Sequence, residues 1–126
     1  MTIKEVSKMF GLTEYTLRYY EKQGLIGPVK KMSNGVRNYS QEDLNRIEFI
    51  KCMRSAELPI DVLKQYIDLY NQGQSTVDER RRLLENQRDI LKNRIRVMQE
   101  AYDKLNIKIE LYDTGKLDKF LENQRK

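Results

Sequence analysis

The chain has 126 residues, of which 34% are charged, and a net charge of +5 with a pI near 9.3, which predicts one compact domain with an extension. It contains no histidine and a single cysteine, Cys52, which argues against an internal disulfide, a structural Cys/His metal cluster and histidine-assisted catalysis. We therefore expect no enzyme, no cofactor and no metal. There is no apolar run of membrane-spanning length and no charged leader, so a cytoplasmic location without a membrane partner is expected.

Two short helices are predicted at the start of the chain. Thr2 and Glu5 have the spacing of a capping box, and Gly11 follows the last apolar residue of that first helix. After a tight turn, Thr13 is placed to cap a second helix that continues to Gly24. Two helices joined by a brief connection with a glycine form a helix-turn-helix, whose second helix enters the major groove of DNA.

The second helix, within "TEYTLRYYEKQGL", has an unusual polar face. A helical wheel assigns Leu17 and Tyr20 to the core and places tyrosine, arginine and lysine on the opposite side. These side chains suit phosphates and base edges, and residues 15–54 hold eight Lys or Arg against four Asp or Glu. The alternative is a solvated charged face with one tyrosine folded onto the core. The predicted DNA contacts of this helix are Tyr15, Thr16, Arg18, Tyr19 and Lys22.

The next stretch, "LIGPVKKMSNGVRNY", reads as a β-hairpin. Asn34-Gly35 lies between two short apolar segments and predicts a type I′ turn. A basic hairpin beside a recognition helix is a wing, which follows the sugar-phosphate backbone. An ordinary surface hairpin with solubilising lysines is the alternative, and Tyr39 is equally suited to anchor the core. Further DNA contacts are predicted at Lys30, Lys31, Arg37, Asn38 and Tyr39.

Two supporting helices are predicted to close the core of this domain, residues 1–73. Ser40 and Asp43 open the third helix, and Leu58-Pro59 interrupts the chain before a fourth helix from Ile60 to about Asn71. The apolar face of the fourth helix carries Leu63, Tyr66, Ile67 and Tyr70.

Residues 74–126 are predicted to form a long dimerisation helix with a short tail. Thr76 and Glu79 suggest a capping box, and no glycine or proline then interrupts the chain before Gly115. At about 1.5 Å per residue this helix exceeds roughly 50 Å, so its apolar stripe needs a second chain and predicts a homodimer. The stripe consists of Val77, Leu84, Leu91, Ile95, Met98, Tyr102, Leu105 and Ile109.

The order of these motifs resembles the MerR family of bacterial transcription regulators. The similar segments are "TLRYYEKQGLI", "GVRNYS", "EDLNRIEFIKCMR" and "LPIDVLKQYIDL", followed by the long helix. The resemblance implies a mainly α fold, with a winged helix-turn-helix domain and an antiparallel coiled coil between two copies. It also implies binding to double-stranded promoter DNA whose spacer is too long for RNA polymerase. Activation would come from distorting that spacer, at a cost of about 1–6 kcal/mol.

The resemblance also suggests which kind of inducer the regulator would sense. Metal-sensing members carry cysteines beside the long helix, whereas "GQSTVDE" and "LYDTGKLDKFLENQRK" contain no Cys or His. Drug-sensing members carry a large C-terminal ligand domain, which we do not expect in the few residues after Gly115. The "IEFIKCMR" segment resembles the branch with a lone cysteine in the third helix that responds to aldehydes, other electrophiles or thiol stress (the AdhR and NmlR type). The resemblance thus implies that Cys52 is a sensor.

The residues alone leave the role of Cys52 open. Lys51 and Arg54 favour a reactive thiolate, while Glu48, one turn earlier, opposes it. Free cysteines also often fill space in a core. Two further functions remain possible from the sequence: a regulator with a non-covalent small-molecule inducer, and a coiled-coil adaptor that binds another protein. Salt dependence distinguishes DNA binding from the adaptor, because phosphate contacts weaken steeply with ionic strength.

Overall fold

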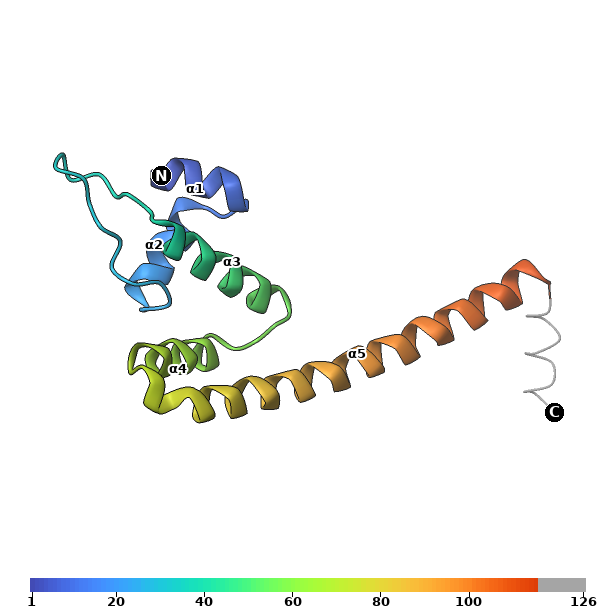
Figure 1. Cartoon of the computed structure of the whole chain (residues 1–126). Helices are drawn as coiled ribbons and strands as arrows, with labels where there is room; N and C mark the ends of the chain where they lie inside the picture. Colours follow the sequence, from blue (N-terminus) through green and yellow to red (C-terminus); the bar gives the residue numbers. More distant parts are fainter. Residues whose placement is uncertain (116–126) are drawn as a thin grey trace. The chain divides into compact units, whose positions relative to one another are not determined.

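The computed structural model describes residues 1–115, and the predicted tail at residues 116–126 lies outside them. The described part is mainly helical, as predicted, and has the order α1 to α5 (Figure 1). The chain divides into two units, Met1–Glu85 and a second that begins at Asn86 within α5. In residues 1–115, no helix is both long and apolar enough to cross a membrane. The helices are α1 (Ile3–Phe10), α2 (Glu14–Lys22), α3 (Gln41–Ser55), α4 (Ile60–Asn71) and α5 (Val77–Asp113), with a 3-10 turn η1 (Gln74–Thr76) before α5.

The helix-turn-helix forms through the predicted caps. The Thr2 hydroxyl accepts from the Glu5 amide at 3.2 Å, while the Glu5 carboxylate accepts from the Thr2 amide at 3.1 Å. Gly11 ends α1 with φ at 65°, in the left-handed region where glycine has no Cβ penalty. The Thr13 hydroxyl then accepts from the Thr16 amide at 3.0 Å and starts α2. Local capping therefore sets the two helices and the turn between them.

The core of Met1–Glu85 draws on all four short helices and on the segment between α2 and α3. Leu17 and Tyr20 are buried, as the helical wheel predicted. Leu25, Ile26 and Val29, which immediately follow α2, are also buried and join the base of the hairpin to the same core. Burial of several large apolar side chains stabilises the position of α2 relative to its supports. The remaining core residues are Val6, Tyr39, Leu44, Ile47, Ile50, Leu58 and Leu63.

The predicted hairpin is present but short. Lys31 and Arg37 form an isolated antiparallel bridge. Next to it, the Asn38 amide donates to the Lys30 carbonyl at 2.7 Å. Three or more strands are usually needed for an independently stable sheet, so this hairpin depends on its attachment to the core.

The turn of the hairpin differs from the prediction. A type I′ turn needs a positive φ at both central residues, but only Gly35 has one, at 82°, and Asn34 does not. The loop instead has three residues, with Met32 paired to Val36 at 2.7 Å and the Gly35 amide bonded to the Met32 carbonyl at 2.9 Å. The Asn34 side chain accepts from the Val36 amide at 3.0 Å, which stabilises this wider loop.

The third and fourth helices follow the predicted punctuation. Ser40 and Asp43 form a reciprocal capping box at the start of α3. Glu57 has a left-handed φ of 65° after the end of α3, and the buried Leu58 and then Pro59 lead into α4. This sharp connection folds α4 back beneath α3 (Figure 1).

At the junction between α4 and α5, the predicted capping box of Thr76 and Glu79 is wrong. Instead of capping α5 through Glu79, the buried Thr76 hydroxyl reaches the carbonyl oxygens of Leu69 and Gly73, the latter at 2.9 Å. It also accepts from Arg80 Nε at 3.1 Å. Thr76 therefore joins the end of α4 to the first turn of α5.

Candidate nucleic-acid interface

The exposed face of α2 retains three of the five residues predicted there. Tyr15 is 78% exposed, and Arg18 and Lys22 are exposed as well. These positions lie three and four residues apart, so they form one stripe along the helix. The stripe presents a hydroxyl, a guanidinium and an ammonium group to solvent, a combination suited to phosphate and base edges.

The other two predicted residues of α2 have mixed environments. Tyr19 is half-buried and packs against the core, with its ring centroid 6.4 Å from that of Tyr20. Tyr19 therefore presents only part of its surface to solvent, and its contact with DNA stays a prediction. Thr16 is half-buried, and its hydroxyl shares a 2.8 Å hydrogen bond with the hydroxyl of Thr13. Thr16 thus takes part in the cap of α2.

The hairpin contributes a second exposed basic group. Lys30 and Lys31 are exposed, and so is Asn38, whose side-chain oxygen accepts from the Met1 amino group at 2.9 Å. Lysine is a mobile point charge that contacts phosphate without demanding one geometry. These residues and the α2 stripe belong to one unit, in which the wing follows the recognition helix directly.

Arg37 links the hairpin to α2. Its Nε donates to Glu21 Oε1 at 2.9 Å, and the two side chains are only 31% and 19% exposed. Glu21 was not among the sequence-predicted site residues, because the pairing spans sixteen residues and follows no local spacing rule. The pair indicates that Arg37 helps to position the wing.

Tyr39 is a core residue. It is 3% exposed, and its amide donates to the Met1 carbonyl at 2.7 Å. The hydroxyl is buried without a hydrogen-bond partner among residues 1–115. Burial, and then the nearby Glu21 carboxylate, raise the pKa of Tyr39 above its ordinary value of 10.0. Of the two roles considered for Tyr39, its position is that of the core anchor.

Cys52 lies on α3 with its side chain exposed and the thiol free. Its position differs from that of a buried space-filling cysteine. Lys51 donates to the Phe10 carbonyl, and Arg54 donates to the Leu58 carbonyl at 2.8 Å. Both cations therefore have structural hydrogen bonds of their own. Within residues 1–115, no cluster of three His, Cys, Asp or Glu side chains is arranged to hold a metal.

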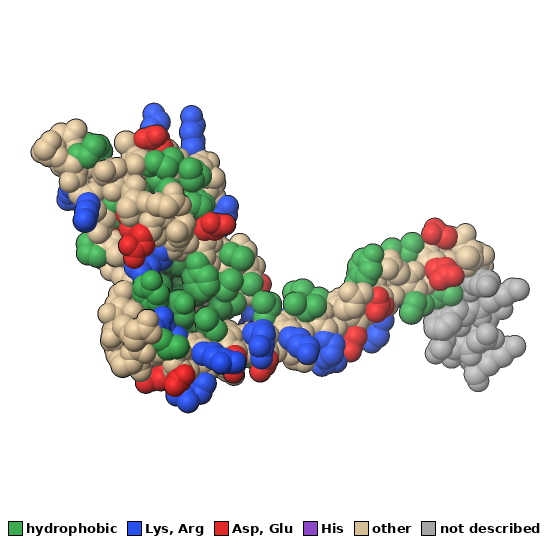
Figure 2. Space-filling model, viewed as in Figure 1, with side chains coloured by type: hydrophobic (Ala, Val, Ile, Leu, Met, Phe, Trp, Pro, Cys, Tyr) green, Lys and Arg blue, Asp and Glu red, His purple; other side chains and the backbone are tan. Residues whose placement is uncertain are grey.

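The predicted dimerisation stripe is exposed along α5. Leu91 is half-buried, and the other seven residues are between 37% and 66% exposed. Apolar side chains are visible along this helix in the space-filling view (Figure 2). Many exposed apolar side chains along one helix are unusual in a monomer and indicate an interaction surface.

Two family models match the chain. A model described as MerR HTH family regulatory protein covers residues 1–69, and one described as MerR, DNA binding covers residues 44–106. The transcriptional regulator AdhR of Bacillus subtilis is 50% identical over 91 residues, which are 72% of this chain and 65% of that protein. A ZntR homologue of Haemophilus influenzae is 36% identical over 68% of this chain and 63% of its own length. The chain thus spans less than two thirds of each of these two relatives.

Two solved structures are similar to this chain as well. A chain described as a MerR family regulator of Listeria monocytogenes is 44% identical and has a TM-score of 0.88, covering 99% of this chain and 95% of its own. HiNmlR, a MerR family regulator lacking the sensor domain and bound to promoter DNA, is 28% identical with a TM-score of 0.81, covering 91% of each chain. The order of helices, the winged helix-turn-helix and both family models lead to one conclusion: the chain belongs to the MerR family of DNA-binding transcriptional regulators.

Proposed function

We propose that the protein acts as a homodimer on promoter DNA, that it regulates transcription by distorting the spacer between RNA polymerase elements, and that Cys52 responds to aldehydes, other electrophiles or thiol oxidants. The observation that carries the proposal is the exposed stripe of Tyr15, Arg18 and Lys22, followed by an exposed basic wing. Neither surface is needed to complete the core. Both have the chemistry that duplex DNA requires.

An antiparallel dimer is supported by charge as well as by exposed apolar residues. Residues 80–96 of α5 carry seven Arg or Lys against two Asp or Glu, whereas residues 97–113 carry two Lys against four Asp or Glu. Antiparallel pairing brings the basic half of one helix alongside the acidic half of its partner. Parallel pairing would place like charges together, which is unfavourable.

Binding and distortion are tested together on the DNA upstream of the protein's own and adjacent genes. A footprint should show a two-fold site, because a symmetric dimer contacts two half-sites. Affinity should fall steeply with salt as phosphate contacts are lost. A circular-permutation assay should show a bent or untwisted spacer. An affinity that does not change with salt concentration would contradict the proposal. So would a duplex that is undistorted both with and without the inducer.

The sensor role is supported by the exposure of the Cys52 thiol, since an electrophile must reach the sulfur. The thiolate would add to the carbonyl carbon of an aldehyde, whose C=O π bond breaks as the oxygen takes up a proton, to give a hemithioacetal. Alternatively, a thiol oxidant would oxidise the thiolate and be reduced in turn. The added group would then alter the packing of α3. Operator occupancy should change little while the geometry of the bound DNA changes.

The test is transcription in vitro with and without an aldehyde. Cys52→Ser is close in size and much less nucleophilic, so it should fold and hold the operator while losing the response. Cys52→Ala serves as a second variant without a hydroxyl. A full response from either folded variant would leave a non-covalent inducer as the better explanation, and a cavity between α3 and α4 provides a place for one.

A further inference from the structure

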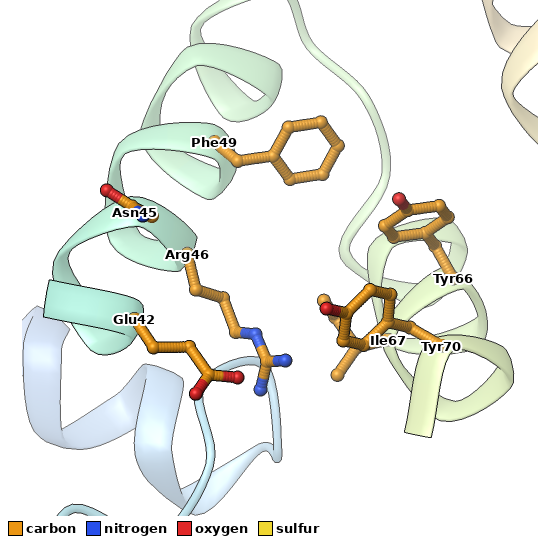
Figure 3. Close-up of a pocket in the computed structure, with 7 residues that line it drawn as sticks. All are labelled: Glu42, Asn45, Arg46, Phe49, Tyr66, Ile67 and Tyr70. Atoms are coloured by element: carbon orange, nitrogen blue, oxygen red, sulfur yellow. The ribbon is translucent and has the colours of Figure 1, made fainter. Parts of the chain in front are cut away.

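A cavity of about 240 Å³ opens between α3 and α4 within the Met1–Glu85 unit. Drug-sized ligands usually occupy roughly 300–1,000 Å³, so this cavity suits a molecule of about one ring. It is separate from the exposed α2 stripe and from the wing lysines. Its lining consists of Glu42, Asn45, Arg46, Phe49, Tyr66, Ile67 and Tyr70 (Figure 3).

Three aromatic side chains line the open cavity. The rings of Phe49 and Tyr66 face each other across α3 and α4 with centroids 5.5 Å apart, and Tyr70 lies one helical turn beyond Tyr66 (Figure 3). Tyr70 is 46% exposed, so part of its ring is accessible from solvent. Planar ring surfaces in a small cavity favour a flat aromatic guest.

One arginine of the lining is available to bind an anion. The Arg46 Cζ lies 5.4 Å from the centroid of the Tyr70 ring, and the Glu42 carboxylate is drawn beside the guanidinium (Figure 3). Among residues 1–115, Arg46 forms no ion pair. Arg80 of α5 lies over the same Tyr70 ring at 5.2 Å. Arg80 does not line the cavity, so the lining holds one cation, Arg46, and one carboxylate, Glu42. An arginine without an ion-pair partner is a bidentate site for a carboxylate.

We propose that this cavity binds a small aromatic carboxylate, with its ring among Phe49, Tyr66 and Tyr70 and its carboxylate on Arg46. Its regulatory consequence rests on the proposed function. Arg46 and Arg80 share Tyr70, and Arg80 also bonds to Thr76 and to the Gly73 carbonyl at the α4–α5 junction. A carboxylate that binds Arg46 draws its guanidinium away from the Tyr70 ring. The ring, over which Arg80 of α5 also lies, then has different contacts. Occupancy therefore alters how α5 is held on α4.

Binding is measured by isothermal titration calorimetry on the full chain with three monocyclic probes of similar size: benzoate, benzamide and benzylammonium. We expect a Kd for benzoate on the order of 0.1–1 mM, as befits a ligand of this size. Benzamide should bind at least tenfold more weakly, and benzylammonium should not bind. Equal affinities for benzoate and benzamide, or no benzoate binding up to about 10 mM, would overturn the proposal.

Variants distinguish a binding role of Arg46 from a structural one. Arg46→Gln should bind benzoate and benzamide with about equal affinity. Arg46→Lys, which retains the charge, should keep part of the preference for benzoate. Phe49→Leu should weaken both probes equally and leave their ratio unchanged. Arg82→Gln, on exposed α5 outside the cavity, is the matched control and should behave as wild type. An Arg46→Gln protein that keeps the full preference would overturn the assignment. If Arg46→Gln does not fold, an Arg46→Lys protein that keeps the full preference would do the same, because lysine lacks the guanidinium fork.

The regulatory step is tested by adding benzoate to the operator complex and measuring transcription and DNA bending. A change that wild type shows and Arg46→Gln lacks supports the proposal. Benzoate binding to a protein that fails to bind its operator would defeat the proposed function and leave the cavity assignment standing. Operator binding without any benzoate binding would defeat the cavity assignment alone.

Discussion

Neighbouring tyrosines of α2 have different environments because each helical residue is rotated by about 100° from the last. Tyr15 is exposed, Tyr19 is half-buried and Tyr20 belongs to the core. Arg18, between them in sequence, shares the exposed face with Tyr15 and Lys22. At this scale, the angular position of each side chain decides whether it is available to DNA.

We expect Arg18→Ala and Lys31→Ala to impair DNA binding differently. If Arg18 makes a bidentate base contact, its loss should cost about 1–3 kcal/mol and relax the preference at particular base pairs. Lys31→Ala should weaken binding to all sequences alike and reduce the salt slope by about one. Titrations on operator and random DNA at several salt concentrations measure both effects. Identical losses on the two DNAs for Arg18→Ala would show that Arg18 contacts phosphate only.

Tyr39→Phe tests the buried hydroxyl that lacks a partner. An unpaired buried hydroxyl costs about 1–3 kcal/mol, so its removal should leave the free energy of unfolding at pH 7 unchanged or raise it. Because the folded pKa of Tyr39 is raised above 10.0, the unfolded chain releases this proton first as pH rises. The contribution of protonated Tyr39 to the free energy of unfolding is therefore present below pH 10 and is lost as the pH rises above it.

As the pH rises from 9 to above 10, we expect the free energy of unfolding of the wild type to fall by more than that of Tyr39→Phe. Urea denaturation over this range measures the difference, and the comparison isolates the Tyr39 hydroxyl because the two proteins differ only there. Parallel pH curves for the two proteins would show that Tyr39 ionises as easily folded as unfolded. A loss of operator affinity in Tyr39→Phe would instead assign the hydroxyl to DNA.

At the scale of elements, the wing is attached to α2 by the Glu21–Arg37 pair and by the buried base of the hairpin. Its single bridge provides little independent stability. The three-residue loop, with Gly35 in the left-handed region, sets the direction in which the tip extends. The orientation of the exposed wing lysines thus depends on contacts made at the base.

Arg37→Ala is expected to weaken operator binding by loosening the wing, without lowering the salt slope. Lys30→Ala, the matched change at an exposed wing cation, should lower the slope by about one. Glu21→Gln should reproduce the Arg37→Ala loss, and the double mutant should be little worse than either, since the two residues act as a pair. A reduced slope in Arg37→Ala with no effect of Glu21→Gln would return Arg37 to the phosphate contacts.

At the scale of the whole molecule, α5 carries the proposed dimerisation surface. The Met1–Glu85 unit includes the first turns of α5, where Thr76 and Arg80 bind the end of α4. The rest of α5 presents its apolar stripe to solvent. Removing the helix after Glu85 therefore separates dimerisation from folding of the DNA-binding unit.

Truncation after Glu85 should yield a folded monomer whose operator affinity falls by two orders of magnitude or more, since two linked half-sites bind far more tightly than one. Sedimentation and operator titration measure the two effects. In the full chain, Met98→Glu should also dissociate the dimer, whereas Gln99→Glu, one residue away and outside the stripe, should not. A truncated protein that binds the full operator as well as the intact chain would rule out the dimer.

Much of the architecture was determined by local sequence. The caps at Thr2, Thr13 and Ser40, the left-handed Gly11 and the break at Pro59 all appear where predicted, because capping and backbone preferences depend on residues a few positions apart. The core positions of Leu17 and Tyr20 followed from helical periodicity for the same reason. The family resemblance, carried by these segments, was confirmed by both family models.

What the tertiary structure alone decided involves residues distant in sequence. Arg37 pairs with Glu21, Thr76 binds the end of α4 in place of a capping box, and aromatic rings of α3 and α4 line an open cavity beside Arg46. The turn at Gly35 also departs from the local rule, which read Asn-Gly as a two-residue turn. Local preferences depend on short chain segments, whereas these contacts depend on how separate elements pack, and packing is a property of the folded chain as a whole.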